Sequence, residues 1–263
     1  MGAFFLFKTD EVFDAQAARK VFADKGNITC KEFALGGLTL WLFGKQLIKE
    51  DNYMLSKNQS AIFAVGTIVY KAKSYRESLS SLLDDFEANR LDYDEMIGAF
   101  CLIFLKNRKV YILTDRANIC HIFANSSHTM LSSSFLALLS AQTKKLPLNK
   151  PAFLEQLLIG YIVAPDTSVS GIYLADALYQ KKVKSQYYTF LSHGNNELKE
   201  QDNKIDFNVC VRAQLDALKA HYNSINLLAT QYGVDIGLSG GYDSRLNLLL
   251  SNNLAVKPSA HTY

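Results

Sequence analysis

Residues 3–191 alternate short apolar runs with turn-forming residues, a pattern that predicts antiparallel strands with a few helices between them. The clearest signal is a pair of apolar runs, 99–105 and 109–114, that flank Asn107-Arg108 and therefore predict a hairpin. Further strands are predicted at 3–8, 38–43, 61–70, 128–134, 171–178 and 184–191, and helices at 11–25, 75–89 and 135–142. The pattern favours an α+β N-terminal domain built on antiparallel sheets.

Two helices in this part carry start signals of their own. Ser74 and Glu77 form a capping box in front of the helix predicted at 75–89. Asn149 and Pro151 open a further helix. The apolar residues of that helix fall on one side: Phe153, Leu154, Leu157, Leu158 and Tyr161. Both patterns predict amphipathic helices.

The composition changes beyond residue 191. The segment 196–205 is polar and charged, and it is the predicted linker between a domain at 1–195 and a second one at 206–263. The chain is 263 residues long, which is enough for two unequal domains.

The second part has the order helix, strand, glycine-rich loop, helix, strand. Its first strand is predicted over Tyr232, Val234 and Ile236, and its last over 254–263. This order is typical of α/β nucleotide-binding domains. Because a parallel sheet of two strands cannot bury both of its faces, we expect this part to be incomplete by itself or completed by something outside the chain.

Composition and charge argue against several classes of function. The chain is 49% hydrophobic and 20% charged, as expected for a well-packed globular protein. Its net charge is only +3 without a basic run, so nothing favours nucleic acid as a partner. No apolar run approaches the length that spans a bilayer, so we also expect no membrane partner.

The four cysteines are widely and irregularly spaced, without a C-x-x-C pair: Cys30, Cys101, Cys120 and Cys210. This spacing predicts free thiols rather than a zinc site or a disulfide framework. It therefore indicates a reducing, cytoplasmic location.

The sharpest chemical signal is the segment 237–245, Gly-Leu-Ser-Gly-Gly-Tyr-Asp-Ser-Arg, between the predicted strand and helix. It lacks the spacing and the lysine of a Walker loop. It matches G-x-S-x-G formally, with Ser239 as a hydrolase nucleophile and His261 as the histidine that follows. It also contains the complete S-G-G-x-D-S pattern of the pyrophosphate loop of ATP pyrophosphatases. An ordinary glycine-rich turn would explain the glycines, but not the two serines and the aspartate.

Several segments together resemble the asparagine synthetase family. Residues 96–102 resemble its "L-x-G-x-F-A-F" strand, and the stretch from Thr114 to Ser134 resembles its "ARDR … PLYY … FASE" stretch. The stretch from Gly171 to Tyr188 resembles its "GI-x-x-L-P-P-G … YW" segment. These pieces occur in the family's order over nearly the whole chain, but only the pyrophosphate loop is specific by itself.

The resemblance implies a four-layer αββα N-terminal domain of the Ntn-hydrolase type. It implies that a truncated α/β domain follows, of the adenine-nucleotide α-hydrolase (PP-loop) type. The family's glutaminase nucleophile is an N-terminal cysteine, whereas this chain has Gly2 in its place. The glutamine-binding "N-G-E" segment falls at Val65-Gly66-Thr67. We therefore expect a degenerate glutaminase domain with no catalytic residue, as in β-lactam synthetases and lasso-peptide cyclases.

For the second domain, the resemblance implies an asparagine synthase-like ligase that adenylates a small-molecule or peptide carboxylate and forms an amide. Its cofactors would be ATP and Mg²⁺, with Asp243 as the metal ligand. The other expected cofactor-binding residues are Leu238, Ser239, Gly240, Gly241, Ser244 and Tyr263. The resemblance is compatible with a homodimer. The alternatives are a non-catalytic scaffold module and the Ser239 hydrolase.

Overall fold

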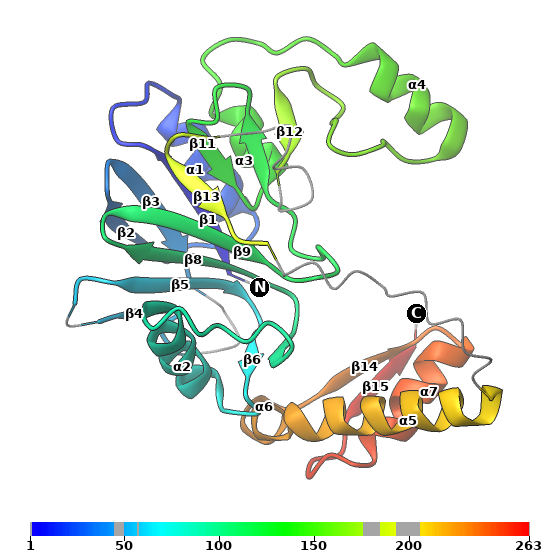
Figure 1. Ribbon diagram of the computed structural model, residues 1–263. Helices are drawn as coiled ribbons and strands as arrows, with labels where there is room; N and C mark the ends of the chain where they lie inside the picture. The colour runs from blue at the N-terminus through cyan, green and yellow to red at the C-terminus, as the bar shows by residue number, and fades with distance from the viewer. Residues whose placement is uncertain (1, 45–49, 57, 176–184, 193–205, 263) are drawn as a thin grey trace. The chain divides into compact units, whose positions relative to one another are not determined.

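The computed structural model describes residues 2–262 except 45–49, 57, 176–184 and 193–205. It shows a mixed α/β protein with several antiparallel sheets (Figure 1). The chain divides into two compact units. The first comprises residues 1–67 and 99–193, and the second comprises 68–98 and 194–263. The linker predicted at 196–205 lies outside the described residues.

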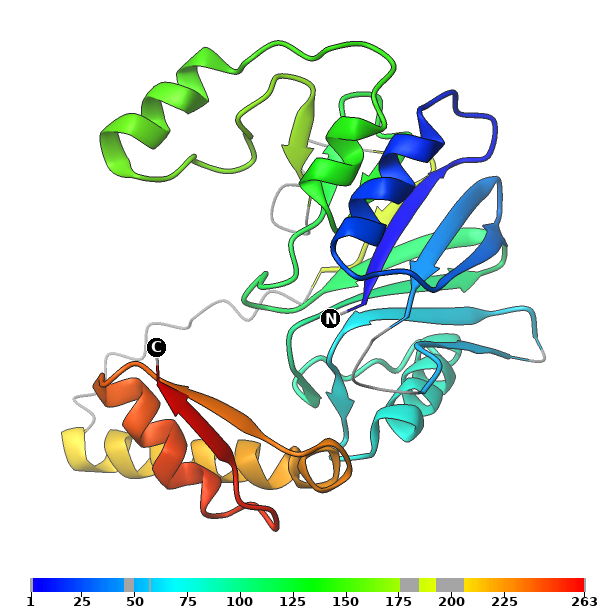
Figure 2. The ribbon, with the colours of Figure 1, turned by 180° about the vertical axis from the view of Figure 1, so that it is seen from behind.

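The first unit contains a six-stranded antiparallel sheet in the order β12-β10-β11-β1-β3-β2. Its strands are β1 (Ala3–Lys8), β2 (Cys30–Leu35), β3 (Leu38–Phe43), β10 (Phe123–Asn125), β11 (Met130–Ser132) and β12 (Ile172–Leu174). Two helices, α1 (Ala15–Asp24) and α3 (Phe135–Ser140), lie side by side on one face of this sheet (Figure 2).

A five-stranded sheet in the same unit has the order β13-β9-β8-β5-β4. Its strands are β4 (Tyr53–Leu55), β5 (Ala61–Gly66), β8 (Phe100–Lys106), β9 (Lys109–Thr114) and β13 (Tyr188–Phe190). Its pairs are antiparallel except β13 with β9, which are parallel. The hairpin predicted around Asn107-Arg108 is confirmed as β8–β9.

The core of the first unit explains why its strands are apolar without alternation. Phe4 and Leu6 of β1 pack with Phe63 and Ile103 of the other sheet. Because side chains alternate across a strand, the residues between them point the other way. Phe5 accordingly packs with residues of α1 and α3, including Phe22 and Leu138. The central strands are thus buried on both faces, in a helix–sheet–sheet arrangement.

Helix α4 (Lys150–Ile159) is confirmed with its predicted cap, because the Asn149 side chain accepts a hydrogen bond from Ala152 N at 3.4 Å. Ala152 is nevertheless the only residue of α4 that is buried in the structure. The predicted apolar side, from Phe153 to Leu158, is exposed, and Leu158 is 81% exposed. The helix stands away from both sheets (Figures 1 and 2).

The second unit contains a small antiparallel ladder and a helix. Strands β6 (Val69–Tyr70) and β7 (Met96–Ile97) pair, and α2 (Tyr75–Glu87) lies between them in sequence. The predicted apolar stripe of α2 is confirmed, because its members are buried: Leu79, Leu82, Leu83 and Phe86. The predicted strand 61–70 is wrong in one respect. It breaks after Gly66, whose φ of +84° is incompatible with a continuous strand.

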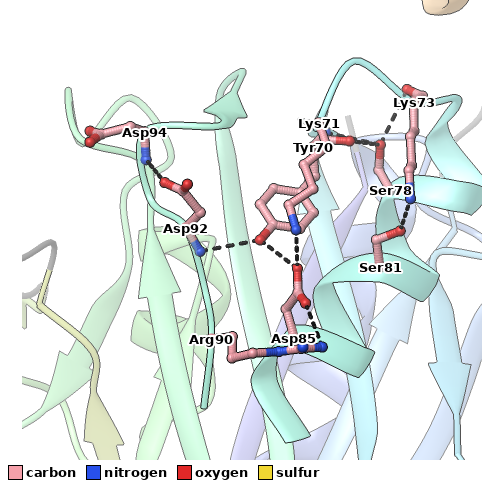
Figure 3. Close-up of polar contacts among 9 residues, drawn as sticks. All are labelled: Tyr70, Lys71, Lys73, Ser78, Ser81, Asp85, Arg90, Asp92 and Asp94. Atoms are coloured by element: carbon pink, nitrogen blue, oxygen red, sulfur yellow. Dashed lines mark hydrogen bonds and ion pairs between the residues drawn. The ribbon is translucent and has the colours of Figure 1, made fainter. Parts of the chain in front are cut away.

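A polar cluster ties α2 to the residues that precede and follow it in the chain (Figure 3). The buried Asp85 carboxylate accepts hydrogen bonds from Tyr70 Oη at 2.8 Å and Lys71 Nζ at 2.6 Å. Arg90 approaches the other carboxylate oxygen at 3.4 Å. Tyr70 Oη in turn accepts a hydrogen bond from Asp92 N at 3.2 Å. We call these residues the Asp85 cluster.

The rest of this unit is of α/β type. Helices α5 (Phe207–Ser224) and α6 (Asn226–Tyr232) precede β14 (Asp235–Leu238), α7 (Tyr242–Ser251) and β15 (Ser259–Thr262). Strands β14 and β15 pair in parallel. The strand predicted over Tyr232, Val234 and Ile236 corresponds to β14 but began too early. Tyr232 is the last residue of α6, and Gly233 is the C-cap of that helix with φ +79°. Among the described residues, no helix combines the length and apolar character that crossing a membrane requires.

Candidate functional site

The predicted order strand, glycine-rich turn, helix is confirmed at the candidate pyrophosphate loop. Strand β14 ends at Leu238, the loop comprises Ser239 to Gly241, and α7 begins at Tyr242. Gly240 has φ +77°, a conformation that L side chains rarely adopt. This conformation turns the chain from the strand into the helix within three residues.

The loop is held mainly through its carbonyl groups. The Arg245 guanidinium donates to Gly240 O at 2.9 Å and to Gly241 O at 3.3 Å. The buried Ser244 hydroxyl also donates to Gly241 O, at 3.1 Å. Arg245 therefore organises the loop.

The backbone donors at the start of α7 have few partners. Gly241 is the N-cap, and no side chain caps the helix. Gly241 N makes one long hydrogen bond, at 3.4 Å, to Ser239 Oγ. The first N–H groups of a helix lack intrahelical partners and carry the positive end of the helix dipole. An anion at this helix start would meet donors that are still available.

The carboxylate of the S-G-G-x-D-S pattern, which belongs to Asp243, is exposed to solvent. Asp243 lies in the first turn of α7. Among the described residues, no group of three or more His, Cys, Asp or Glu side chains gathers in a way that could hold a metal ion. Magnesium sites often use only one or two carboxylates together with substrate phosphates. Asp243 fits that kind of site, but not a site made of protein ligands alone.

Leu238 and Tyr263 are the two other residues that the resemblance assigns to the nucleotide. Leu238 is half-buried at the end of β14, directly in front of the loop. Tyr263 lies outside the described residues.

The geometry around Ser239 does not support a hydrolase. Among the described residues, the Ser239 hydroxyl contacts Gly241 N and Ser244 Oγ, both at 3.4 Å. His261 lies on β15, and its Nδ1 is 3.0 Å from Asp235 Oδ1. A nucleophilic serine needs a base within hydrogen-bond reach. The histidine has a carboxylate partner, but the serine hydroxyl is not hydrogen-bonded to that histidine.

The residues that the resemblance assigned to a degenerate glutaminase site meet in the first unit. Gly2 and Val65 both line a pocket of about 290 Å³. Gly66 beside them is required by packing, because a Cβ there would lie 2.1 Å from Ala99 O. The segment Val65-Gly66-Thr67 thus has a structural role, and Thr67 N donates to the same carbonyl at 2.8 Å.

Sequence reasoning did not assign the other residues that line this pocket, among them Lys25, Cys120 and Ser134. Asp115, in the segment that resembles "ARDR", helps to shape this region. Its buried carboxylate accepts hydrogen bonds from Ile119 N at 2.9 Å and Cys120 N at 3.0 Å. No local pattern in the sequence marks Lys25 and Ser134 as neighbours, because 109 positions separate them.

No protein-family model matches this chain, and no curated protein matches it.

Proposed function

We propose that the second unit binds the pyrophosphate part of ATP in an ATP-dependent, AMP-forming amide ligase of the asparagine synthetase type. The observation that carries the proposal is the S-G-G-x-D-S sequence, found at a tight turn between β14 and an α7 without a side-chain cap. A glycine-rich turn at a helix start is suited to phosphate because backbone N–H groups and the helix dipole act together.

In this proposal, each residue of the loop has a distinct role. Gly240 and Gly241 allow close approach of the phosphate and present backbone N–H groups, and Ser239 and Ser244 add hydroxyl donors. Asp243 would hold Mg²⁺ in its exposed position. When bound, Mg²⁺ would neutralise charge that develops on the departing pyrophosphate.

The proposal also covers the two substrates that the ligase would join. The substrate would be a small-molecule or peptide carboxylate that is activated by adenylation and then joined to an amine, as in asparagine biosynthesis. The four-layer Ntn-type fold of the first domain, its lack of glutaminase activity, a homodimer and a cytoplasmic location are further parts of the proposal. The helix–sheet–sheet core supports the Ntn-type fold, and Gly2 in the pocket supports the lack of glutaminase activity. The spacing of the cysteines supports the cytoplasmic location.

Binding of magnesium pyrophosphate and Mg-ATP tests the function directly. A few charge-assisted hydrogen bonds, worth about 1.5–3 kcal/mol each, must offset the lost freedom of the ligand. We therefore expect a dissociation constant of about a millimolar at best. The amide NMR signals of Gly240 and Gly241 should shift on titration.

Asp243→Asn should weaken the magnesium-dependent part of this binding while the fold stays intact, since the side chain is exposed. Asp216→Asn is the matched control, because it removes an equally exposed carboxylate from α5 of the same unit. If the loop amides do not respond, or if Asp243→Asn and Asp216→Asn behave alike in the presence of Mg²⁺, the assignment of the site is wrong.

A further inference from the structure

The pocket in the first unit has a charged end that the proposed ligase does not use. Its volume is about 290 Å³, and its lining includes Lys25, from the C-terminal end of α1, and Ser134, which precedes α3. Lys25 Nζ donates a hydrogen bond to Ser134 Oγ at 3.2 Å. Among the described residues, Lys25 makes no ion pair. The pocket therefore offers an ammonium group, on an exposed side chain, that has no acidic partner among those residues.

The serine at this end is fixed by its neighbours. Ser134 is buried, its backbone N donates to Ser132 Oγ at 3.0 Å, and its own Oγ accepts from Ala137 N at 3.3 Å. The hydrogen bond to this hydroxyl directs the exposed lysine side chain toward the pocket wall. Ammonium and hydroxyl donors that converge are the usual partners of an oxyanion.

The remainder of the pocket is largely apolar. Phe22 and Val65 are buried and line it, together with the partly buried Phe123. A liquid water takes about 30 Å³, so the volume corresponds to roughly ten waters, which is enough for a ligand of similar heavy-atom count. No aspartate or glutamate is among the described residues that line the pocket, so the ammonium group of an amino acid would meet no carboxylate partner there.

We propose that this pocket binds a small monocarboxylate with an apolar body, its carboxylate on Lys25 Nζ and its body against Phe22 and Val65. We expect glutamine not to bind, because its ammonium group would meet no carboxylate among the described lining residues, although Asn27, His121 and Ser133 add polar groups to the pocket. The pocket and the pyrophosphate loop belong to different units, so each can be tested without the other.

The experiment titrates the whole chain with three probes and follows backbone NMR signals. Benzoate has the required charge and size, benzamide has the same shape without the charge, and L-glutamine carries both an amine and an amide. We expect benzoate to shift signals of residues around Lys25, Val65 and Ser134. Benzamide should bind about tenfold more weakly or less, and glutamine should not bind.

Substitutions at the lysine separate charge from structure. Lys25→Gln should weaken benzoate binding about tenfold, and Lys25→Arg should retain most of it. Lys20→Gln is the matched control, because Lys20 is an exposed lysine on the same helix and does not line the pocket. Equal binding of benzoate and benzamide, an unaffected Lys25→Gln variant, shifts that map elsewhere, or binding of glutamine would each overturn the proposal.

Discussion

Asp85 is the electrostatic centre of the segment between β6 and β7, and Asp85→Asn removes its charge at nearly constant volume. In the wild type, the carboxylate accepts hydrogen bonds from Tyr70 Oη and Lys71 Nζ (Figure 3). An asparagine would keep one acceptor for the buried tyrosine. It would also turn its amide group toward Arg90, so that two donors face each other, because Tyr70 and Lys71 share the other oxygen of Asp85.

The magnitude depends on how far the partners are buried. Removing one member of a fully buried ion pair costs about 3–5 kcal/mol, and an exposed pair is worth about 0–1 kcal/mol. The Asp85 side chain is 11% exposed, but those of Lys71 and Arg90 are 40% and 70% exposed. Both cations can therefore regain water when the charge is lost. We expect Asp85→Asn to cost about 1–2 kcal/mol.

The pH dependence has a defined sign. The hydrogen bond from Lys71 is the main cause that lowers the pKa of Asp85 below its ordinary value of 3.8. A carboxyl with a lower pKa in the folded state stabilises the fold above its unfolded-state pKa. That stability is lost as the pH falls through the folded-state pKa. The difference between wild type and Asp85→Asn should therefore be full near neutral pH and shrink below about pH 4.

Urea denaturation at pH 7 and at pH 3, together with hydrogen exchange of residues 68–98, provides the measurement. Asp84→Asn is the matched control, because Asp84 is the adjacent acid on α2 and is exposed. Its loss should leave both measurements close to wild type. The reasoning is refuted if Asp85→Asn is as stable as Asp84→Asn at pH 7, or if its deficit is the same at pH 3.

Two further changes test the packing of the first unit. Gly66→Ala should cost more than about 3 kcal/mol or prevent folding, because the new Cβ would lie 2.1 Å from Ala99 O at a φ of +84°; the yield of folded protein and its thermal midpoint are the readouts. Asn125→Ala should cost about 2–4 kcal/mol, because the buried Asn125 Oδ1 accepts from Thr129 N at 3.0 Å and Met130 N at 2.9 Å; an unfolding midpoint in urea like that of wild type would contradict this estimate.

Local patterns predicted most of the helices and central strands, because the residues that favour each element by their intrinsic propensity are also the ones that it buries. Strand β1 and helix α2 are examples, since their apolar residues are buried where the pattern put them. Short strands such as β4 and β10 have three residues each and carry too little periodicity to be predicted. Helix α6 was not predicted. Its last residue, Tyr232, also fits the alternation of the predicted strand with Val234 and Ile236, whereas in the structure Gly233 separates the helix from that strand.

Helix α4 shows a different limit. Its cap and its apolar content predicted a helix correctly, but a sequence pattern does not identify the surface that covers an apolar side. In the structure, that side is exposed. The same limit applies to the pocket in the first unit, where the contact between Lys25 and Ser134 arises only when α1 and α3 meet on one sheet.

The candidate pyrophosphate loop is visible in the sequence because its pattern lies within six consecutive residues, whereas the contacts that hold the loop are not visible there. A loop that is stabilised through its N–H groups would have used up the donors that an anion needs. Here Arg245 and Ser244 bind carbonyl oxygens of Gly240 and Gly241. Side chains of Asp14, Ser134, Asn149 and Asp206 cap the helices α1, α3, α4 and α5, whereas among the described residues none caps α6 or α7. The loop is therefore organised through its acceptors, which is the arrangement that leaves its donors to a ligand.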